Sequence, residues 1–230
     1  MFEHAQDEYF SIIQRLGASP WLDIGCGWHL LWPWQLEEEQ CLVHDKFIVG
    51  VDPDREALGK HRTIRKRVCA EGGNLPFRDN FFALTTANVM IEHVTHPEVF
   101  LREIWRTTQP GGMFLFHTVN SWGYLGIGTR LVPNRFHAKV LRLISPNRAE
   151  SDVYPTQYRL NTNSAIRRCA RQTGWEIRSL SFLTTVPAFQ RGLPWLVESL
   201  WIRMLRTRIF RRLRTNLIAI LVKPGGGSAA

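Results

Sequence analysis

The feature that most constrains the fold of this chain is a short apolar run that ends in two glycines, residues 21–27 with the sequence WLDIGCG. A buried parallel strand followed by a tight turn has this pattern, because Gly25 and Gly27 lack a Cβ atom and let the backbone bend sharply. The same absence lets the backbone approach a bound molecule, and a helix after such a turn points its N–H groups at that molecule. The segment predicts a strand and a ligand-binding turn.

A second apolar run, FIVGV at residues 47–51, ends in Asp52. The carboxyl ends of neighbouring parallel strands lie at the same edge of a sheet. A carboxylate at that edge can accept hydrogen bonds from both hydroxyls of a ribose. The two segments, in this order, predict a nucleoside-binding edge.

Apolar strands alternate with helical patterns over the first half of the chain, after an opening amphipathic helix that stops at Gly17. We expect strands at 20–25, 47–52, 67–71, 81–88 and 113–119, and helices at 32–40, at 54–62 and from Pro97 to the break at Pro110. This alternation is typical of a parallel sheet covered by helices on both faces. The fold class predicted is α/β.

The second half of the chain is less regular. We expect an insertion over the sheet at 120–160 with a helical stretch near 134–144, then a helix capped near Asn161 or Thr162 and stopped by Gly174. Two strands, at 175–183 and 216–222, should enclose a helical segment that breaks around 205–208, because its apolar residues change sides there.

The 230 residues, 44% of them hydrophobic, suffice for one α/β domain with extensions. We expect a single domain over 1–230, with a ligand-binding core at 20–119, substrate-side extensions at 120–160 and 186–214, and a flexible tail at 225–230. No secretory signal and no transmembrane segment are indicated. The four cysteines form no Cys-x-x-Cys pair, so neither a disulfide framework nor a metal site is predicted, and a cytoplasmic location follows.

The formal net charge of +9 is concentrated near the end of the chain. Residues 186–223 contain seven arginines and one lysine, but Glu198 is their one acidic residue. Such a segment suits an anionic partner: a membrane surface, a phosphorylated substrate carrier or nucleic acid. Peripheral contact with an anionic membrane through 191–214 is one prediction, and a solvated helix face is the alternative.

Four segments in order carry a resemblance to a known family. They are LDIGCG at 22–27, VGVD at 49–52, EGGNLPF at 71–77, and the stretch from IEHV at 91–94 to PGG at 110–112. The chain resembles the class I S-adenosylmethionine-dependent methyltransferases, in particular those of quinone biosynthesis and small-molecule methylation, and less specifically members from cell-surface sugar or lipid-linked pathways. The resemblance implies a seven-stranded Rossmann-like sheet whose last two strands form an antiparallel pair.

The resemblance also implies roles for individual residues. Gly25 and Gly27 would lie against the methionine part of S-adenosylmethionine, and Asp23 would face its ammonium group. The other implied contacts to the donor are the ribose diol for Asp52, the adenine amino group for Glu71 and the backbone of Gly72, and the border of the reacting methyl for Asn88. S-adenosylhomocysteine would be the product. His29 stands where most members have a third glycine, so the turn geometry should differ.

Methyl transfer needs a base only when the acceptor is a protonated hydroxyl, since the donor sulfonium loses its charge in the displacement. His93 and His117 are the candidates, because both follow or lie in strands near the expected pocket and imidazole titrates near neutrality. For each of them, a helix cap or a packed core histidine is the favoured interpretation. The acceptor itself, small-molecule or lipid-linked, has no motif in the sequence, and neither has the oligomeric state.

Two other functions use similar residues. A nicotinamide-dependent oxidoreductase also has a glycine turn and an acid after the second strand, but residue 30 is leucine where that fingerprint has a third glycine. A non-catalytic protein of the same fold is the second alternative. A nucleic-acid methyltransferase is disfavoured, because Asn88 is followed by VMI and not by the Pro-Pro-aromatic sequence typical of base amino methylation.

Overall fold

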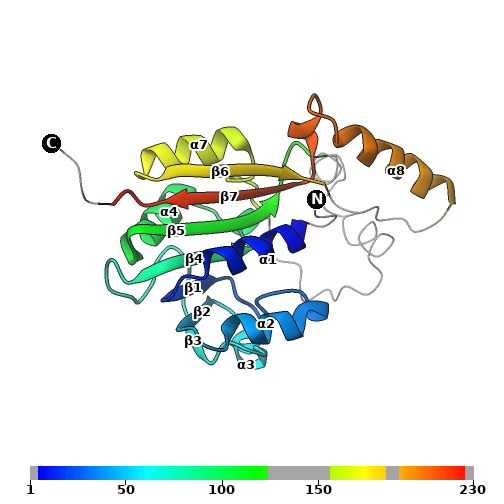
Figure 1. Cartoon of the computed structure of the whole chain (residues 1–230). Coiled ribbons are helices and arrows are strands. Elements are labelled where there is room, and N and C mark those ends of the chain that lie inside the picture. The colour runs from blue at the N-terminus through cyan, green and yellow to red at the C-terminus, as the bar shows by residue number, and fades with distance from the viewer. Residues whose placement is uncertain (1–4, 124–155, 185–191, 226–230) are drawn as a thin grey trace.

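The structure is a computed structural model, which describes residues 5–123, 156–184 and 192–225. Seven strands form one sheet in the order β3-β2-β1-β4-β5-β7-β6. Their bounds are β1 Trp21–Ile24, β2 Ile48–Asp52, β3 Lys66–Cys69, β4 Phe82–Asn88, β5 Thr108–Val119, β6 Glu176–Leu183 and β7 Asn216–Val222. The sheet therefore joins strands from both halves of the chain (Figure 1).

The five strands of the first half run parallel, and β7 runs antiparallel to both β5 and β6. Asp23 on β1 pairs with Gly50 on β2 and with Thr86 on β4, so the carboxyl ends of these strands meet at one edge. The start of β7 lies at that same edge, because Asn216 pairs with Val119 at the end of β5. The predicted α/β sheet with an antiparallel ending is confirmed.

Helices cover both faces of the sheet (Figure 1). The helical elements are α1 Ala5–Leu16, α2 Leu36–Val43, α3 Arg55–Lys60, α4 Pro97–Thr107, α7 Asn163–Gln172 and α8 Gly192–Leu205, with short 3₁₀ turns η1 Pro33–Gln35, η2 Ile91–His93 and η4 Arg211–Leu213. Residues of α1, α2 and α3 pack in one apolar cluster and those of α4 and α7 in another. Side chains alternate along each strand between the two clusters, as both faces of a covered sheet require.

Most boundaries shift by one or two residues from the sequence-based expectation, and two differ by more. Between 32 and 40 the chain first makes η1 and only then α2, because Pro33 begins a tighter turn and the rings of Trp32 and Trp34 stack at 5.2 Å. No helix therefore follows directly on Gly27. Strand β5 begins at Thr108, before the Pro-Gly-Gly break, because Thr108 pairs with Phe82 and a bulge follows.

Some expectations fall outside the described residues, among them the insertion helix near 134–144 and most of the tail after 225. The break expected around 205–208 is confirmed, because α8 ends at Leu205.

In the described ranges, no helix combines the length and the hydrophobicity that crossing a membrane would require. All four cysteines are free, and Cys26 and Cys169 are buried. The division into a core and extensions stays a prediction.

Candidate active site

The turn after β1 has the left-handed geometry that its glycines predict. Gly25 has φ +68° and Gly27 has φ +51°, and the Gly25 N–H donates to the Val51 carbonyl at 2.8 Å. A Cβ atom at Gly25 would lie 2.8 Å from Met90, whereas a Cβ atom at Gly27 would meet no atom of the described residues within 4 Å. Gly25 is therefore needed for packing, and Gly27 borders open space.

Asp52 joins the tip of β2 to this turn. Its Oδ2 atom accepts a hydrogen bond from the Gly27 N–H at 2.9 Å, and Oδ1 accepts one from the Asp54 N–H at 2.9 Å. A carboxylate can accept about four hydrogen bonds, so each oxygen keeps acceptor capacity for a ligand. The structure brings together the glycine and the acid that the sequence predicted to be neighbours.

Asp23 lies behind the turn and is 3% exposed. Its Oδ1 atom accepts a hydrogen bond from the Thr86 hydroxyl, which itself accepts one from the indole N–H of Trp21 at 2.7 Å. The pKa of Asp23 is raised to about 8: burial is the main cause, the hydrogen bond from Thr86 opposes it, and the charges of Glu39 and Asp52 add smaller increases. The carboxyl is therefore largely protonated at neutral pH, and a cation beside it would favour the ionised form.

A second polar cluster lies at the ends of β4 and β5, and we call it the His117 cluster. His117 Nδ1 is 2.9 Å from Asn88 Oδ1 and 3.3 Å from Gln6 Nε2 on α1, and His117 Nε2 is 3.1 Å from Asn216 Oδ1 on β7. His117 is 3% exposed, and burial lowers its pKa to about 4, against a smaller opposing effect of the bond to Asn216. The imidazole is therefore neutral at physiological pH and carries one N–H: with Nε2 donating to Asn216 Oδ1, Nδ1 is an acceptor, for which the Gln6 amide is the donor.

Helix α1 covers the His117 cluster. Gln6 also accepts a hydrogen bond from the Asn88 amide at 3.3 Å. One turn further along, the fully buried Tyr9 ring has its centroid 6.0 Å from that of His117. Burial and the charge of Asp23 raise the pKa of the Tyr9 hydroxyl, so this side chain is neutral as well. The first helix thus shields the ends of β4 and β5.

The remaining predicted residues lie around this edge. Glu71 is exposed in the loop after β3, and that loop starts with a hydrogen bond from the Ala70 N–H to the Asp52 carbonyl at 3.3 Å. Gly72 is needed for packing, because a Cβ atom there would lie 2.6 Å from the Phe100 ring. His93 ends η2, just beyond β4, and is half-buried. The described contacts bring Asn88 to His117, and they do not bring Glu71 to Asp23.

Sequence reasoning missed three members of these clusters and a further hydrogen-bonded residue beyond β4, Glu92. Gln6, Thr86 and Asn216 belong to the clusters, while Glu92 accepts hydrogen bonds through its backbone carbonyl from the Gln157 and Tyr158 N–H groups at 2.6 and 3.0 Å. The signal for Thr86 was a polar residue inside a buried strand. Gln6 shares a helix face with Tyr9, whereas the partners of Asn216 are distant in sequence and left no local pattern.

In the parts of the chain that the structure describes, no group of three or more histidine, cysteine, aspartate or glutamate side chains is placed to hold a metal ion. The chemistry available at this edge is that of the glycine turn with Asp52 and of the neutral hydrogen-bonding groups in the His117 cluster. We call Gly25, Gly27, Asp23 and Asp52 the donor edge.

Comparison with known proteins identifies the domain. Residues 22–116 match the family described as "Methyltransferase domain". The chain is similar to the 2-methoxy-6-polyprenyl-1,4-benzoquinol methylase of Caenorhabditis elegans, 36% identical over 76 residues, which cover 28% of this chain and 27% of that protein. It is also similar to the ubiquinone biosynthesis O-methyltransferase of Rattus norvegicus, 28% identical over 160 residues, which cover 61% of this chain and 44% of that protein. The matches thus span less than half the length of these curated relatives.

Among solved structures, the chain is similar to the geranyl diphosphate C-methyltransferase of Streptomyces coelicolor A3(2), with a TM-score of 0.59 and 13% identity, over 94% of this chain and 77% of that one. At this identity the likeness shows the fold. The domain match, the seven-stranded sheet and the four ordered motifs agree. Residues 22–116 therefore match a methyltransferase domain, and the predicted resemblance to the class I S-adenosylmethionine-dependent methyltransferases is confirmed for that part of the chain.

Proposed function

We propose that this protein transfers the methyl group of S-adenosylmethionine to a small-molecule acceptor or to one linked to a lipid or sugar. The observation that carries the proposal is the 2.9 Å hydrogen bond between the Gly27 N–H and Asp52, which fixes the glycine turn beside a carboxylate with remaining acceptor capacity. Open space above Gly27 gives a ligand room to approach the backbone there.

The donor edge fits the donor molecule by its chemistry. Asp52 would accept hydrogen bonds from the ribose hydroxyls, and the buried carboxyl of Asp23 would face the ammonium group, directly or through water. Glu71 and the Gly72 backbone would border the adenine. When bound, S-adenosylmethionine supplies an electrophilic methyl on a sulfonium, and the protein contributes alignment and exclusion of water.

The His117 cluster would border the reacting methyl through Asn88. His117 is buried behind Gln6, with Nε2 hydrogen-bonded to Asn216 and Nδ1 2.9 Å from Asn88 Oδ1, so we assign it as a residue that helps to position Asn88. His93 is half-buried beyond β4 and is the remaining candidate for a general base if the acceptor is a hydroxyl. Residues 120–160 and 186–214 would shape the acceptor pocket.

The acceptor class rests on the relatives. The name of one relative states a polyprenyl benzoquinol, and the name of another states an O-methyltransferase of ubiquinone biosynthesis. Two features of this chain agree with an acceptor of that kind. The helix α8 and the turn after it are apolar and basic, and this segment leads into the start of β7. We place the protein in the cytoplasm, at the surface of a membrane.

Calorimetric titration tests the donor assignment directly. Micromolar binding of S-adenosylmethionine or S-adenosylhomocysteine, with no binding of NADH or NADPH, is expected for the methyltransferase, and the reverse preference would replace it by the oxidoreductase. Incubation with donor labelled in the methyl group, followed by separation of lipid and aqueous extracts, locates the acceptor. Donor binding without label transfer to either extract would favour the non-catalytic alternative.

A further inference from the structure

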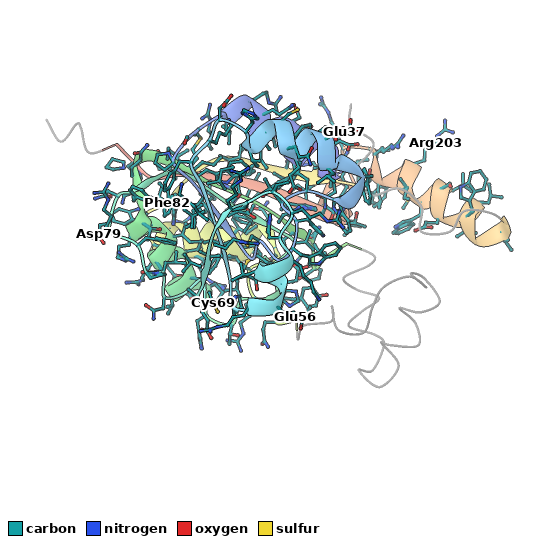
Figure 2. All side chains as sticks on the ribbon, turned by 90° about the horizontal axis from the view of Figure 1, so that it is seen from below. Glu37, Glu56, Cys69, Asp79, Phe82 and Arg203 are labelled. Carbon is teal, nitrogen blue, oxygen red and sulfur yellow. The ribbon has the colours of Figure 1, made fainter. Side chains whose placement is uncertain are left out.

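Helix α8 leaves the body of the molecule beside the carboxyl end of β6 and the start of β7 (Figure 1). Figure 2 shows the same helix projecting in the perpendicular view, with the Arg203 side chain pointing away from it. Its carboxyl end is fixed by the guanidinium of Arg214, which donates to the carbonyls of Leu205, Arg206 and Phe182, each at 2.9 Å. The helix is therefore attached to β6 at one end and extends outward.

The two sides of α8 differ in burial. One side consists of Glu198, Ile202 and Leu205, which are 9%, 4% and 0% exposed. The opposite side presents large apolar residues to solvent at the three- and four-residue spacing of a helix face: Leu193 at 73%, Leu196 at 48%, Val197 at 60% and Leu200 at 58% exposed. We call these four residues the outer face. A contiguous apolar face of this kind on a folded protein marks a binding surface.

Two tryptophans of α8 are also exposed: Trp201, at 39%, lies beside the outer face, and Trp195, at 43%, lies on the side of Ile202, seven positions further on. Indole rings favour the boundary between lipid headgroups and acyl chains, because one part of the ring is apolar and the N–H is polar. A purely hydrophilic partner would gain nothing from these side chains. The combination favours a partner that is apolar inside and polar at its surface.

The charge beside the outer face is positive. Arg203, Arg206, Arg208, Arg211 and Arg212 are all exposed, and in the part of the chain that the structure describes none forms an ion pair with an acidic side chain. Glu198 is the one acid between 192 and 214, and it is buried. Two copies of the chain joined through this surface would bring these arginines together, so self-association is electrostatically disfavoured.

We propose that α8 and the turn after it dock on an anionic lipid membrane, with the outer face in the headgroup boundary and the five arginines against lipid phosphates. Apolar burial and attraction to anionic lipid together give such helices their affinity. The turn η4 leads directly to Asn216 of the His117 cluster, so docking would set the proposed acceptor side of the site beside the membrane. This last step rests on the proposed function, whereas the docking itself does not.

Sedimentation with vesicles tests the docking. The whole protein is mixed with vesicles of phosphatidylcholine alone or with one third phosphatidylglycerol, at low and high salt. Wild type should bind the anionic vesicles, and high salt should weaken the binding. The variant L196S/L200S should bind about tenfold more weakly. The variant R208Q/R211Q/R212Q should bind on the order of a hundredfold more weakly.

A matched control comes from α7, whose Arg167, Arg168 and Arg171 are also exposed. The variant R167Q/R168Q/R171Q removes the same charge elsewhere and should change vesicle binding by about twofold or less. Equal binding to neutral and anionic vesicles, or an equal loss in the α7 variant, would overturn the proposal. So would a dimer in analytical ultracentrifugation that L196S/L200S abolishes.

Donor titration separates this inference from the proposed function. All the vesicle variants should bind S-adenosylmethionine like wild type, because none lies at the donor edge. Loss of vesicle binding with donor binding intact refutes neither assignment, and it is the expected result for the α8 variants. Wild type that binds the donor and ignores anionic vesicles would refute the docking alone, whereas vesicle binding without donor binding would refute the methyltransferase alone.

Discussion

Helices α7 and α8 belong to the same half of the chain, yet they bury opposite kinds of residue. Helix α7 buries Ala165, Ile166, Cys169 and Ala170 against the sheet and turns its arginines to solvent. Helix α8 exposes its outer face and buries Glu198 with only two large apolar residues. The pattern of α7 is explained by folding, because its apolar side completes the core that α4 and β5 begin.

The pattern of α8 is not explained by folding in the same way. Exposed apolar surface costs free energy, on the order of 25 cal/mol for each Å² left in water. A helix that the fold needs would turn its leucines inward, as α7 does with Ile166. The difference teaches that α7 is part of the scaffold common to the fold, and that α8 is adapted to a partner.

The largest expected effect is on stability and tests the comparison itself. Ile166→Ala should lower the free energy of unfolding by about 2–5 kcal/mol, because Ile166 is fully buried and its truncation leaves a cavity. Leu200→Ala should change it by about 0.5 kcal/mol or less, because that side chain is 58% exposed. Urea denaturation measures both. A comparable loss in the Leu200 variant would mean that α8 is part of the core.

The second effect concerns the donor edge, which should depend on the scaffold and not on α8. Asp52→Ala should weaken S-adenosylmethionine binding by on the order of 3 kcal/mol, roughly a hundredfold, because two ribose hydrogen bonds and the contact to Gly27 are lost. Asp54→Ala is the matched control, since Asp54 caps α3 by accepting from the Glu56 and Ala57 N–H groups. Calorimetry should find donor affinity unchanged in that control, and equal losses in both would contradict the role of Asp52.

The third effect is a pH dependence of donor binding. The pKa of Asp23 is about 8 in the unliganded protein, and a bound ammonium lowers it, so binding releases a proton. Donor affinity should therefore rise with pH, by up to about tenfold for each unit below 8, and level off above. Asp23→Asn cannot release this proton, and its affinity should lack that rise between pH 6 and 7. The amino group of S-adenosylmethionine itself titrates in the same way with wild type and with the Asp23→Asn variant. An identical pH dependence of affinity in the two proteins would therefore contradict an ammonium beside Asp23.

The smallest effect distinguishes the two glycines of the turn. Gly27→Ala should cost about 1 kcal/mol of stability, because alanine is strained at φ +51° although there is room for its methyl group. Gly25→Ala should cost more, since its Cβ atom would also meet Met90 at 2.8 Å. Thermal unfolding of the two variants measures which substitution costs more stability. The reverse order would show that the space above Gly27 is filled.

Much of the fold followed from local patterns. The spacing of Tyr9, Ile12 and Ile13 predicted α1. A cap near Asn161 or Thr162 predicted the start of α7, and the cap is Thr162, whose hydroxyl accepts from the Ala165 N–H at 3.1 Å. The late start of α2 was missed, because a proline after a stacking tryptophan can begin either a helix or a tighter turn. Local patterns define elements well and their first residues less well.

The candidate site was predictable only where its residues end consecutive strands. Gly27 and Asp52 were expected to meet, because parallel neighbours place their carboxyl ends together, and they do. His117 was expected either near the pocket or packed in the core, but its contact with Asn216, 99 positions away, was not predicted. The pKa of a buried group depends on such neighbours, so no local pattern could have given the lowered value.

The amino-acid sequence by itself determined the alternation of strands and helices, the glycine turn and the acid that faces it, because periodicity and backbone freedom are properties of adjacent residues. Only the tertiary structure decided which glycine borders open space, which carboxyl is protonated, and which side of α8 meets solvent. Burial and electrostatics arise between residues that lie far apart in the chain and close together in space, and the folded arrangement alone sets those distances.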